Sequence, residues 1–487
     1  MKTNLAAFAG AMAFSALGAA AQTTPNPTVT GPIASTAVPG DASHDYIFFS
    51  ADHGLAANGY VEEEYFISGT ANQYSFPTAG ADATVRTTGN PYTTRIVVRR
   101  PADRANFNGT VLVEWYNVTN GFDAENVWFF GWEHILRAGY AWVGVSAQQV
   151  GVNALKRWNT TRYASLNVLS DDSLAYDIFS QAGQAVRHPV GIDVLGGLHP
   201  RTFIGTGESQ SAQRLSVYIN SIMPLSTPVY DGVLLESTFG QSIRTDPRVP
   251  VFKVLYEWDT QTGEAAIRAP DTKMFHRWEV AGTAHVDHHL RLSREPLELR
   301  DNAAVSSEAN AAPHCTVPNI GSRDPNHYVF DAAIEAMVKW VQRRKAPPTS
   351  PLFQIASFGP GNAATIARDQ YGNAIGGIRL SQLEVPIASN VGQNTPLDSS
   401  GSACPRWGYH LPFDVATLNG LYPSHHRYVD AVARVTFDNV RKGFLLPPDA
   451  LRTIEDAISS NVGAGKNPWD DARDRLDLES DPEFRWP

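Results

Sequence analysis

Residues 202–212 read Thr-Phe-Ile-Gly-Thr-Gly-Glu-Ser-Gln-Ser-Ala, a short β-prone run that leads into a Gly-x-Ser-x-Ser pentapeptide and a helix-prone segment. This is the sequence form of a nucleophile elbow, in which a serine on a strained strand-to-helix turn is exposed at the top of a sheet. The turn brings backbone segments close together, so small residues are needed two positions before and after the serine. Gly207 and Ser211 meet that need. The pattern makes Ser209 a candidate nucleophile, although a strand and a helix joined by a chance serine would give the same letters.

A nucleophilic serine needs an imidazole base, and in this fold class the histidine comes late in the chain. Residues 277–287 indicate a strand, a turn at Gly282 and then His285 on a loop. We prefer His285 as the base because the small residues 282–284 allow a tight approach after the strand. The rival histidines nearby are His276, His288 and His289.

The imidazole in turn needs a carboxylate that orients it, and three candidates are open. The β-prone run from Val249 to Tyr256 ends in Glu257-Trp258-Asp259. Asp259 suits an acid on the turn after the strand, whereas Glu257 is closer to the strand end and has a longer reach. These two rank nearly level, and Glu236, which follows the preceding strand-like run, ranks behind them.

Acyl transfer also needs two donors for the oxyanion. One is the backbone N–H after the nucleophile, here that of Gln210, and the other comes from the loop after an earlier strand. The predicted strand 109–115 is followed by a loop that contains Asn117 and Val118. We expect the N–H of Asn117 or Val118 to be the second donor.

No metal and no cofactor are predicted. His285, Asp287 and His289 would form a metal site only on an extended strand, and no further cysteine or glutamate spacing supports one. The sequence contains no P-loop, zinc-finger spacing or dinucleotide fingerprint.

Beyond these motifs, the chain resembles the alpha/beta hydrolase domain-containing proteins of bacterial and fungal genomes, a branch of the serine α/β-hydrolases. The resembling segments run almost from end to end and include residues 59–65, 92–101, 108–115, 139–148, 205–212, 278–287 and 443–450. The resemblance implies an α/β-hydrolase fold and serine-esterase chemistry. It places the triad on Ser209, His285 and either Glu257 or Asp259, and it implies no particular substrate.

The fold class expected from the pattern is α/β, with a mostly parallel central sheet covered by helices and a C-terminal accessory or lid region. We expect an extended or disordered segment at residues 22–44, a catalytic domain at 45–348 and the accessory region at 349–487. The alternation of strands and helices is expected to break from about Leu290 to Asn326, which is polar and rich in proline and serine. In the accessory region, we expect Trp407, Tyr409 and His410 either to line a pocket or to form a local core.

Residues 1–21 are predicted to be a signal peptide. A weakly basic start precedes an apolar run from Leu5 to Leu17, and Ala19-Ala20-Ala21 gives a small-residue cleavage site. The run is too short for a membrane span of roughly 20 residues. The protein is therefore expected to be exported, to the periplasm or the medium.

Cys315 and Cys404 are the two cysteines of the chain. In an oxidising compartment two thiols most simply pair, so we expect a disulfide between them. The alternative is two free, buried thiols.

The chain has 487 residues and a formal net charge of −10, and no Lys/Arg-rich run is present. This argues against nucleic acid as a partner, because phosphate binding needs a basic face. The leading hypothesis is an exported serine esterase that acts on a small-molecule or polymer ester. The alternatives are an amidase, peptidase or acyltransferase with the same triad, and a non-catalytic binding protein on a hydrolase scaffold. The oligomeric state does not follow from the sequence.

Overall fold

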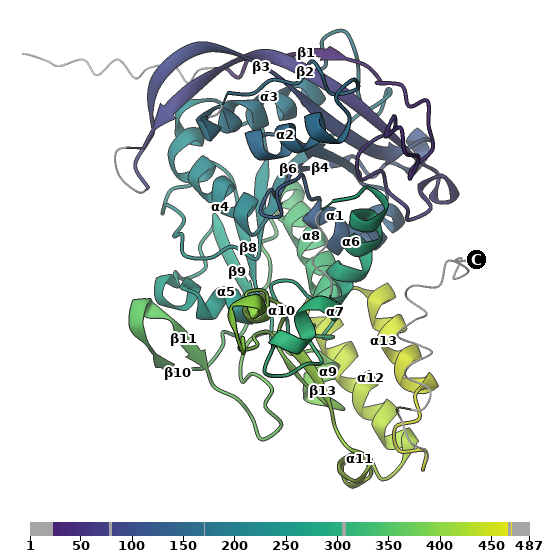
Figure 1. Cartoon of the computed structure of the whole chain (residues 1–487). Coiled ribbons are helices and arrows are strands. Elements are labelled where there is room, and N and C mark those ends of the chain that lie inside the picture. The colour runs from purple at the N-terminus through teal and green to yellow at the C-terminus, as the bar shows by residue number, and fades with distance from the viewer. Residues whose placement is uncertain (1–22, 77–79, 170, 304–307, 466–468, 470–487) are drawn as a thin grey trace, which may run out of the picture.

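The computed structural model describes residues 23–76, 80–169, 171–303, 308–465 and 469 (Figure 1). The predicted signal peptide, residues 1–21, lies outside the described residues. The segment predicted to be extended contains strand β1 (Thr28–Thr30), which pairs with β2 (Tyr60–Ser75).

A nine-stranded sheet in the order β1-β2-β3-β5-β4-β6-β7-β8-β9 forms the centre of the molecule. The first three strands are antiparallel, and β3 also meets β5 in antiparallel fashion. From β5 onward all neighbours are parallel. The remaining strands of this sheet are β3 (Thr84–Pro101), β4 (Thr110–Trp115), β5 (Ala141–Val145), β6 (Thr202–Glu208), β7 (Gly232–Glu236), β8 (Val251–Leu255) and β9 (Phe275–Glu279).

The parallel strands are buried along their whole lengths, as expected for strands covered by helices on both faces. Helix α1 (Asn126–Arg137) packs against α6 (His288–Arg300) and α8 (Asn326–Arg343). Helices α3 (Ala175–Arg187) and α4 (Gln210–Val217) meet on the other side, where Phe179 contacts Tyr218 just after α4 (Figure 1). This arrangement confirms the predicted α/β fold with a mostly parallel sheet.

The expected break after the candidate histidine is only partly correct, because α6 occupies residues that we expected to be irregular. The side chain of Asp287 accepts a hydrogen bond from the N–H of Leu290 and caps the helix. Ion pairs one turn apart, Arg291 with Glu295 and Arg294 with Glu298, support the helix around Pro296. The polar composition of this segment gave no helical pattern of apolar residues, because the charged side chains of the helix pair with one another and are largely buried.

The remaining helices connect strands of the sheet, follow its last strand or belong to the C-terminal region, which packs below the sheet in Figure 1. The other helices are α2 (Gln149–Trp158), α5 (Glu257–Gln261), α7 (Glu308–Ala311), α9 (Ser381–Glu384), α10 (Cys404–Trp407), α11 (Val415–Leu421), α12 (His425–Lys442) and α13 (Pro447–Ser459). Two antiparallel two-stranded sheets, β10 (Ile355–Phe358) with β11 (Ala364–Ile366) and β12 (Ala388–Val391) with β13 (Tyr409–Pro412), complete the described strands.

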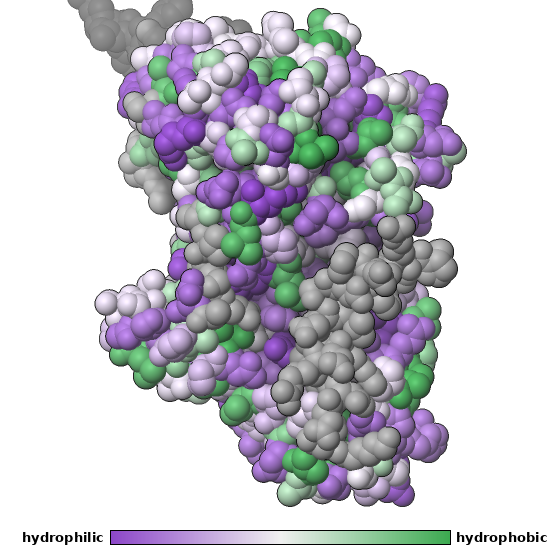
Figure 2. Space-filling model, turned by 45° about the vertical axis from the view of Figure 1, so that its right-hand side comes forward, coloured by the Kyte–Doolittle hydropathy of each residue, from purple (hydrophilic) through white to green (hydrophobic). Residues whose placement is uncertain are grey.

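Several contacts fasten the C-terminal region to the sheet domain. Arg137 on α1 forms an ion pair with Asp449 on α13 at 2.8 Å. The N–H of Ala281, after β9, donates to the carbonyl of Ile378. On the face in Figure 2, hydrophobic residues are scattered in small groups among hydrophilic ones. Among the described residues, no helix is long and apolar enough to cross a bilayer.

Candidate active site

Ser209 lies on the turn between β6 and α4, where its φ of 54° and ψ of −116° are unusual for a residue with a side chain. Such strain is characteristic of a nucleophile elbow, which lifts the side chain out of the sheet. A Cβ on Gly207 would lie only 2.9 Å from the Oγ of Ser211, so a larger residue would not fit. The Ser211 hydroxyl accepts from the N–H of Glu208 and donates to its carbonyl, which fastens the turn.

A chain of hydrogen bonds leads away from the candidate nucleophile. The Oγ of Ser209 lies 2.7 Å from the Nε2 of His285. The Nδ1 of the same ring lies 2.7 Å from the Oδ1 of Asp259. Ser209 is 9% exposed, His285 3% and Asp259 0%, so bulk water barely reaches the two contacts. The structure thus brings together three residues that the sequence analysis selected.

Ser237 joins this chain, and the sequence analysis did not select it. Its Oγ donates to the carboxylate of Asp259 at 2.9 Å and lies 2.7 Å from the Nδ1 of His285. The residue directly follows β7 and has a φ of 51°. The Ser237 hydroxyl therefore contacts both the imidazole of His285 and the carboxylate of Asp259.

Glu257 faces away from the imidazole. Its carboxylate accepts from the N–H of Gly282 and the N–H of Gly392, and it forms an ion pair with Arg368 at 2.7 Å. The third candidate, Glu236, accepts a hydrogen bond from the hydroxyl of Tyr256 at 2.6 Å. Burial raises the pKa of Glu236 well above its usual range. Of the three carboxylates, only that of Asp259 meets Nδ1 of His285.

The neighbouring histidines and Asp287 have other surroundings. His276 lies on β9 against the ring of Trp340, and His289 stacks on His327 with the ring centroids 3.7 Å apart. Asp287 caps α6. Within the described part of the chain, no group of three or more His, Cys, Asp or Glu side chains is arranged to hold a metal ion.

The three candidate oxyanion residues differ in whether their backbone N–H can turn to a ligand. The N–H of Asn117 donates to the carbonyl of Ala124 at 2.9 Å and is thereby occupied. The N–H of Val118 makes only a long contact, 3.4 Å, with the side-chain oxygen of Gln210. Gln210 itself is the first residue of α4, where backbone N–H groups point out of the helix. Of the three candidates, Val118 and Gln210 are therefore the two whose backbone N–H groups could turn to a ligand at the elbow.

Glu208, next to the candidate nucleophile, is a further residue that the sequence analysis missed. Its carboxylate accepts from the side-chain amides of Asn117 and Asn126, and its Oε1 lies 3.5 Å from the Nε2 of His285. Burial is the main reason that the pKa of Glu208 is raised above its ordinary value. The side-chain amide of Asn117 also donates to the carbonyl of Glu208, so Glu208 connects the loop that contains Asn117 and Val118 to the elbow.

A small cavity of about 60 Å³ opens onto Ser209 and His285. Two cationic side chains line it, Arg294 from α6 and Arg406 from α10, together with the ring of Trp407. A larger cavity of about 380 Å³ in the C-terminal region is lined by Arg379 and its ion-pair partners and contains no candidate nucleophile. The candidate catalytic residues therefore border the smaller of these two cavities.

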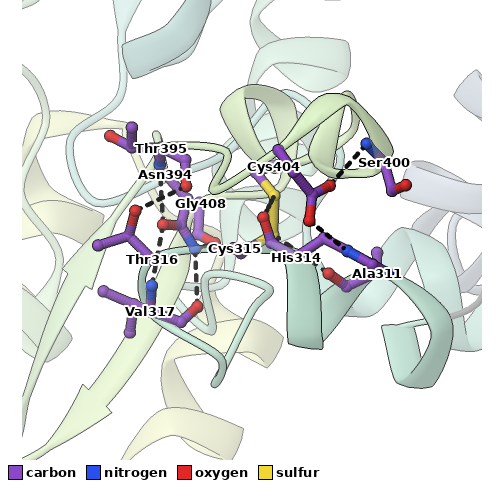
Figure 3. The surroundings of a disulfide bond; sticks show 11 residues. Ala311, His314, Cys315, Thr316, Val317, Asn394, Thr395, Ser400, Cys404 and Gly408 are labelled. Carbon is purple, nitrogen blue, oxygen red and sulfur yellow. Dashed lines mark hydrogen bonds and ion pairs between the residues drawn. A yellow bond between two sulfur atoms is a disulfide. The ribbon is translucent and has the colours of Figure 1, made fainter.

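Helix α10 forms one wall of the small cavity, and the predicted disulfide links this helix to Cys315. Cys315 and Cys404 are bonded, with their Cα atoms 5.6 Å apart, and α10 begins at Cys404 (Figure 3). The carbonyl of Arg406 accepts from the N–H of Val286, directly after the candidate base. The guanidinium of Arg291 lies 4.2 Å from the ring centroid of Trp407. The accessory region thus contributes directly to the site, and Trp407 lines it whereas His410 is buried against Asn390.

An elbow serine at the end of a central parallel strand, with a histidine and helices on both faces of the sheet, defines the α/β-hydrolase class of folds. Residues 29–455 match the family model described as the alpha/beta hydrolase domain, and the chain belongs to that family. No protein of curated function matches the chain.

Solved structures with partial similarity include an esterase and a serine hydrolase homologue. The structure of esterase Est22 is 14% identical, has a TM-score of 0.31, and the match covers 52% of this chain and 82% of that chain. An alpha-beta serine hydrolase homologue from Coxiella burnetii is 13% identical with a TM-score of 0.29, over 43% of this chain and 91% of that one.

Proposed function

We propose that this protein is an exported serine hydrolase that cleaves a carboxylic ester through an acyl-enzyme. The observation that carries the proposal is the continuous contact from Ser209 Oγ to His285 Nε2 and from His285 Nδ1 to Asp259, each 2.7 Å long. A serine, an imidazole and a carboxylate in this relation are the requirements for an activated hydroxyl.

In the first half-reaction, the Oγ of Ser209 bonds to the ester carbonyl carbon as His285 Nε2 takes the hydroxyl proton. The tetrahedral intermediate collapses, the carbon–oxygen bond to the alcohol breaks, and the imidazolium returns its proton to the leaving oxygen. In the second half-reaction, His285 takes a proton from a water molecule whose oxygen bonds to the acyl carbon. The bond from that carbon to Ser209 Oγ then breaks, the imidazolium returns its proton to Oγ, and the carboxylic acid is released.

The carboxylate of Asp259 holds the imidazole with Nε2 toward the serine and stabilises the positive charge that forms on the ring. We assign the acid role to Asp259 rather than Glu257, because Glu257 is engaged by Arg368 and two backbone N–H groups. Asp259 is held in turn by the N–H of Tyr256, at 2.8 Å.

The N–H groups of Gln210 and Val118 are proposed to hold the oxyanion. The side-chain oxygen of Gln210 makes only a long contact with the Val118 N–H, so a substrate oxygen can displace it. Preorganised donors of this kind lower the barrier by roughly 3 kcal/mol each. The bond from Asn117 to Glu208 keeps Val118 beside the elbow.

The test is the intact mass of the protein after treatment with a fluorophosphonate, for the wild type and for Ser209→Ala. A single adduct in the wild type that is absent from Ser209→Ala, together with hydrolysis of 4-nitrophenyl butyrate by the wild type alone, supports the proposal. A folded Ser209→Ala variant with full esterase activity, or a folded wild type that neither reacts nor hydrolyses esters, would overturn it.

Export is part of the same proposal and rests on the residues 1–21 and on the disulfide, which persists in oxidising compartments. Expression in a bacterial host and mass determination of the periplasmic fraction test it. A mature chain that begins at Gln22 is expected, and an uncleaved chain confined to the cytoplasm contradicts export.

A further inference from the structure

Two arginines approach the candidate nucleophile from different parts of the chain. Arg294 comes from α6 and Arg406 from α10, and both line the cavity that contains Ser209 and His285. An ester carbonyl and an apolar acyl chain need no cation beyond the oxyanion donors. The presence of two guanidinium groups at this small cavity therefore needs its own explanation.

Arg294 is held in place by an ion pair. Its Nε lies 3.1 Å from the Oε1 of Glu298, one turn along α6, and its side chain is 5% exposed. Glu298 is fully buried, so its carboxylate gives Arg294 a counter-charge within the helix.

Arg406 has no such counter-charge among the residues that the structure describes. Its guanidinium makes no hydrogen bond or ion pair with any residue in the described part of the chain, although its side chain is half-buried at the cavity. Burial is the main reason that its pKa is lowered, and the positive charge of Arg294 lowers it further. A partly desolvated charge without a partner is costly, and an anion brought by a ligand would offset that cost.

Glu208 is the acidic residue that acts most on Arg406, yet it does not pair with it. Its carboxylate is instead occupied by the amides of Asn117 and Asn126. The raised pKa of Glu208 also weakens it as a permanent counter-charge.

The backbone around Arg406 fixes where its side chain can reach. Its carbonyl accepts from the N–H of Val286, and its neighbour Trp407 is held by Arg291 and by the N–H of Ser322. Two residues earlier, Cys404 forms the disulfide (Figure 3). A guanidinium presented from a fastened helix is suited to a planar, bidentate anion.

We propose that the substrate of this site is an ester that carries a carboxylate, which Arg406 binds while Ser209 attacks the ester carbonyl. This inference rests on the proposed serine hydrolase function and names its substrate class. Arg294 lines the same cavity and adds positive potential there. The carboxylate belongs either to the acyl part or to the alcohol part of the ester, and both arrangements place an anion beside the reacting group.

Three chromogenic esters test the proposal. The first is 4-nitrophenyl butyrate, which is neutral; the second is the 4-nitrophenyl monoester of glutaric acid, with the carboxylate on the acyl part. The third is the butyrate ester of 5-hydroxy-2-nitrobenzoic acid, with the carboxylate on the alcohol part. We expect the wild type to have a higher kcat/KM for one of the two anionic esters than for the neutral ester.

The Arg406→Gln variant should lower the ratio of kcat/KM for that anionic ester over the neutral ester by roughly 10- to 100-fold, as for the loss of a charged hydrogen bond. Arg406→Lys should recover part of the ratio, because the charge remains and the bidentate geometry is lost. Arg427→Gln, at an exposed position on α12, is the matched control and should leave the ratio unchanged.

Failure of this inference differs from failure of the proposed function. If the wild type hydrolyses the neutral ester at least as well as both anionic esters, or if Arg406→Gln keeps the wild-type ratio, the carboxylate site is wrong while the esterase stands. If no ester is hydrolysed and the fluorophosphonate forms no adduct, the proposed function fails and the substrate class fails with it.

Discussion

The hydroxyl of Ser237 lies 2.7 Å from the Nδ1 of His285, the same nitrogen that faces Asp259. The hydroxyl has a single proton, which it donates to the Asp259 carboxylate. It can therefore only accept from the imidazole, so the Nδ1–H is shared between a carboxylate and a hydroxyl. This arrangement keeps the ring oriented with Nε2 toward Ser209.

Removal of this hydroxyl should slow the reaction modestly. Ser237→Gly is the suitable variant, because a φ of 51° favours glycine and adds no strain. Loss of one hydrogen bond of about 1 kcal/mol predicts a roughly fivefold lower kcat/KM for 4-nitrophenyl butyrate. Ser237→Ala, the control, should lose as much activity and also some thermal stability. Unchanged kinetics in the glycine variant would show that the contact plays no part in orienting the base.

Two neighbouring carboxylates should respond differently to amide substitution. Asp259→Asn is expected to lower kcat by roughly 10³- to 10⁴-fold while the protein remains folded, because the imidazole loses its charged partner. Kinetics with the chromogenic ester and circular dichroism measure both quantities.

Glu257→Gln should instead cost stability. Glu257 is buried but Arg368 is 25% exposed, so we expect a loss of about 2 kcal/mol, less than for a fully buried pair. A kcat near that of the wild type is expected below the melting temperature. A large kcat loss in Glu257→Gln with little in Asp259→Asn would reverse the assignment of the acid.

The disulfide should contribute to stability through the loop that it closes. Cys315 and Cys404 are 89 positions apart, and in the chain-entropy model such a loop stabilises by about 4–5 kcal/mol. The Cys315→Ala/Cys404→Ala variant should therefore melt at a clearly lower temperature in a calorimetric scan. Dithiothreitol should lower the melting temperature of the wild type and leave the melting temperature of the double variant unchanged. Identical transitions for both proteins without reductant would refute a stabilising role.

Acidification should destabilise the protein partly through His410. Burial lowers the pKa of this residue to about 3, from 6.5 in the unfolded chain, and the positive charges of Arg323 and His288 add to the effect. Between these values the unfolded state binds a proton that the folded state does not, so the unfolding free energy falls as the pH falls. From pH 6.5 to pH 5 the expected loss is about 2 kcal/mol.

Urea unfolding at pH 7.5, 6.5 and 5 measures this loss. Between pH 6.5 and pH 5, the unfolding free energy of His410→Gln should fall by about 2 kcal/mol less than that of the wild type. His426→Gln, at a histidine with an 84% exposed side chain, should follow the wild-type curve. If the unfolding free energies of His410→Gln and the wild type changed equally with pH, the acid sensitivity would come from other groups.

The elbow could be predicted because its determinants are local. Gly207, Ser209 and Ser211 lie within five consecutive positions, and the turn itself requires their small sizes. The parallel strands were readable as apolar runs for a similar reason, since burial on both faces leaves no polar alternation. Helix α6 escaped prediction because its stability comes from a capping Asp287 and paired charges rather than from an apolar stripe.

Asp259 and Glu257 could not be separated by spacing, because either carboxylate can reach the end of the strand. Their directions follow from the backbone of α5, which turns Asp259 toward His285 and leaves Glu257 against Gly282 and Arg368. The roles of Ser237 and Glu208 also depend on neighbours from other strands, which no local pattern reports.

The amino-acid order alone determined the α/β class, the position of the strained serine and the two cysteines available to pair, because each follows from residues close in sequence or from composition. Only the tertiary structure decided which carboxylate meets the imidazole and which N–H remains available near the elbow. It alone also placed Arg294 and Arg406 at one cavity. The physical reason is that hydrogen bonds and charge interactions act over a few ångströms in space, whatever the separation along the chain.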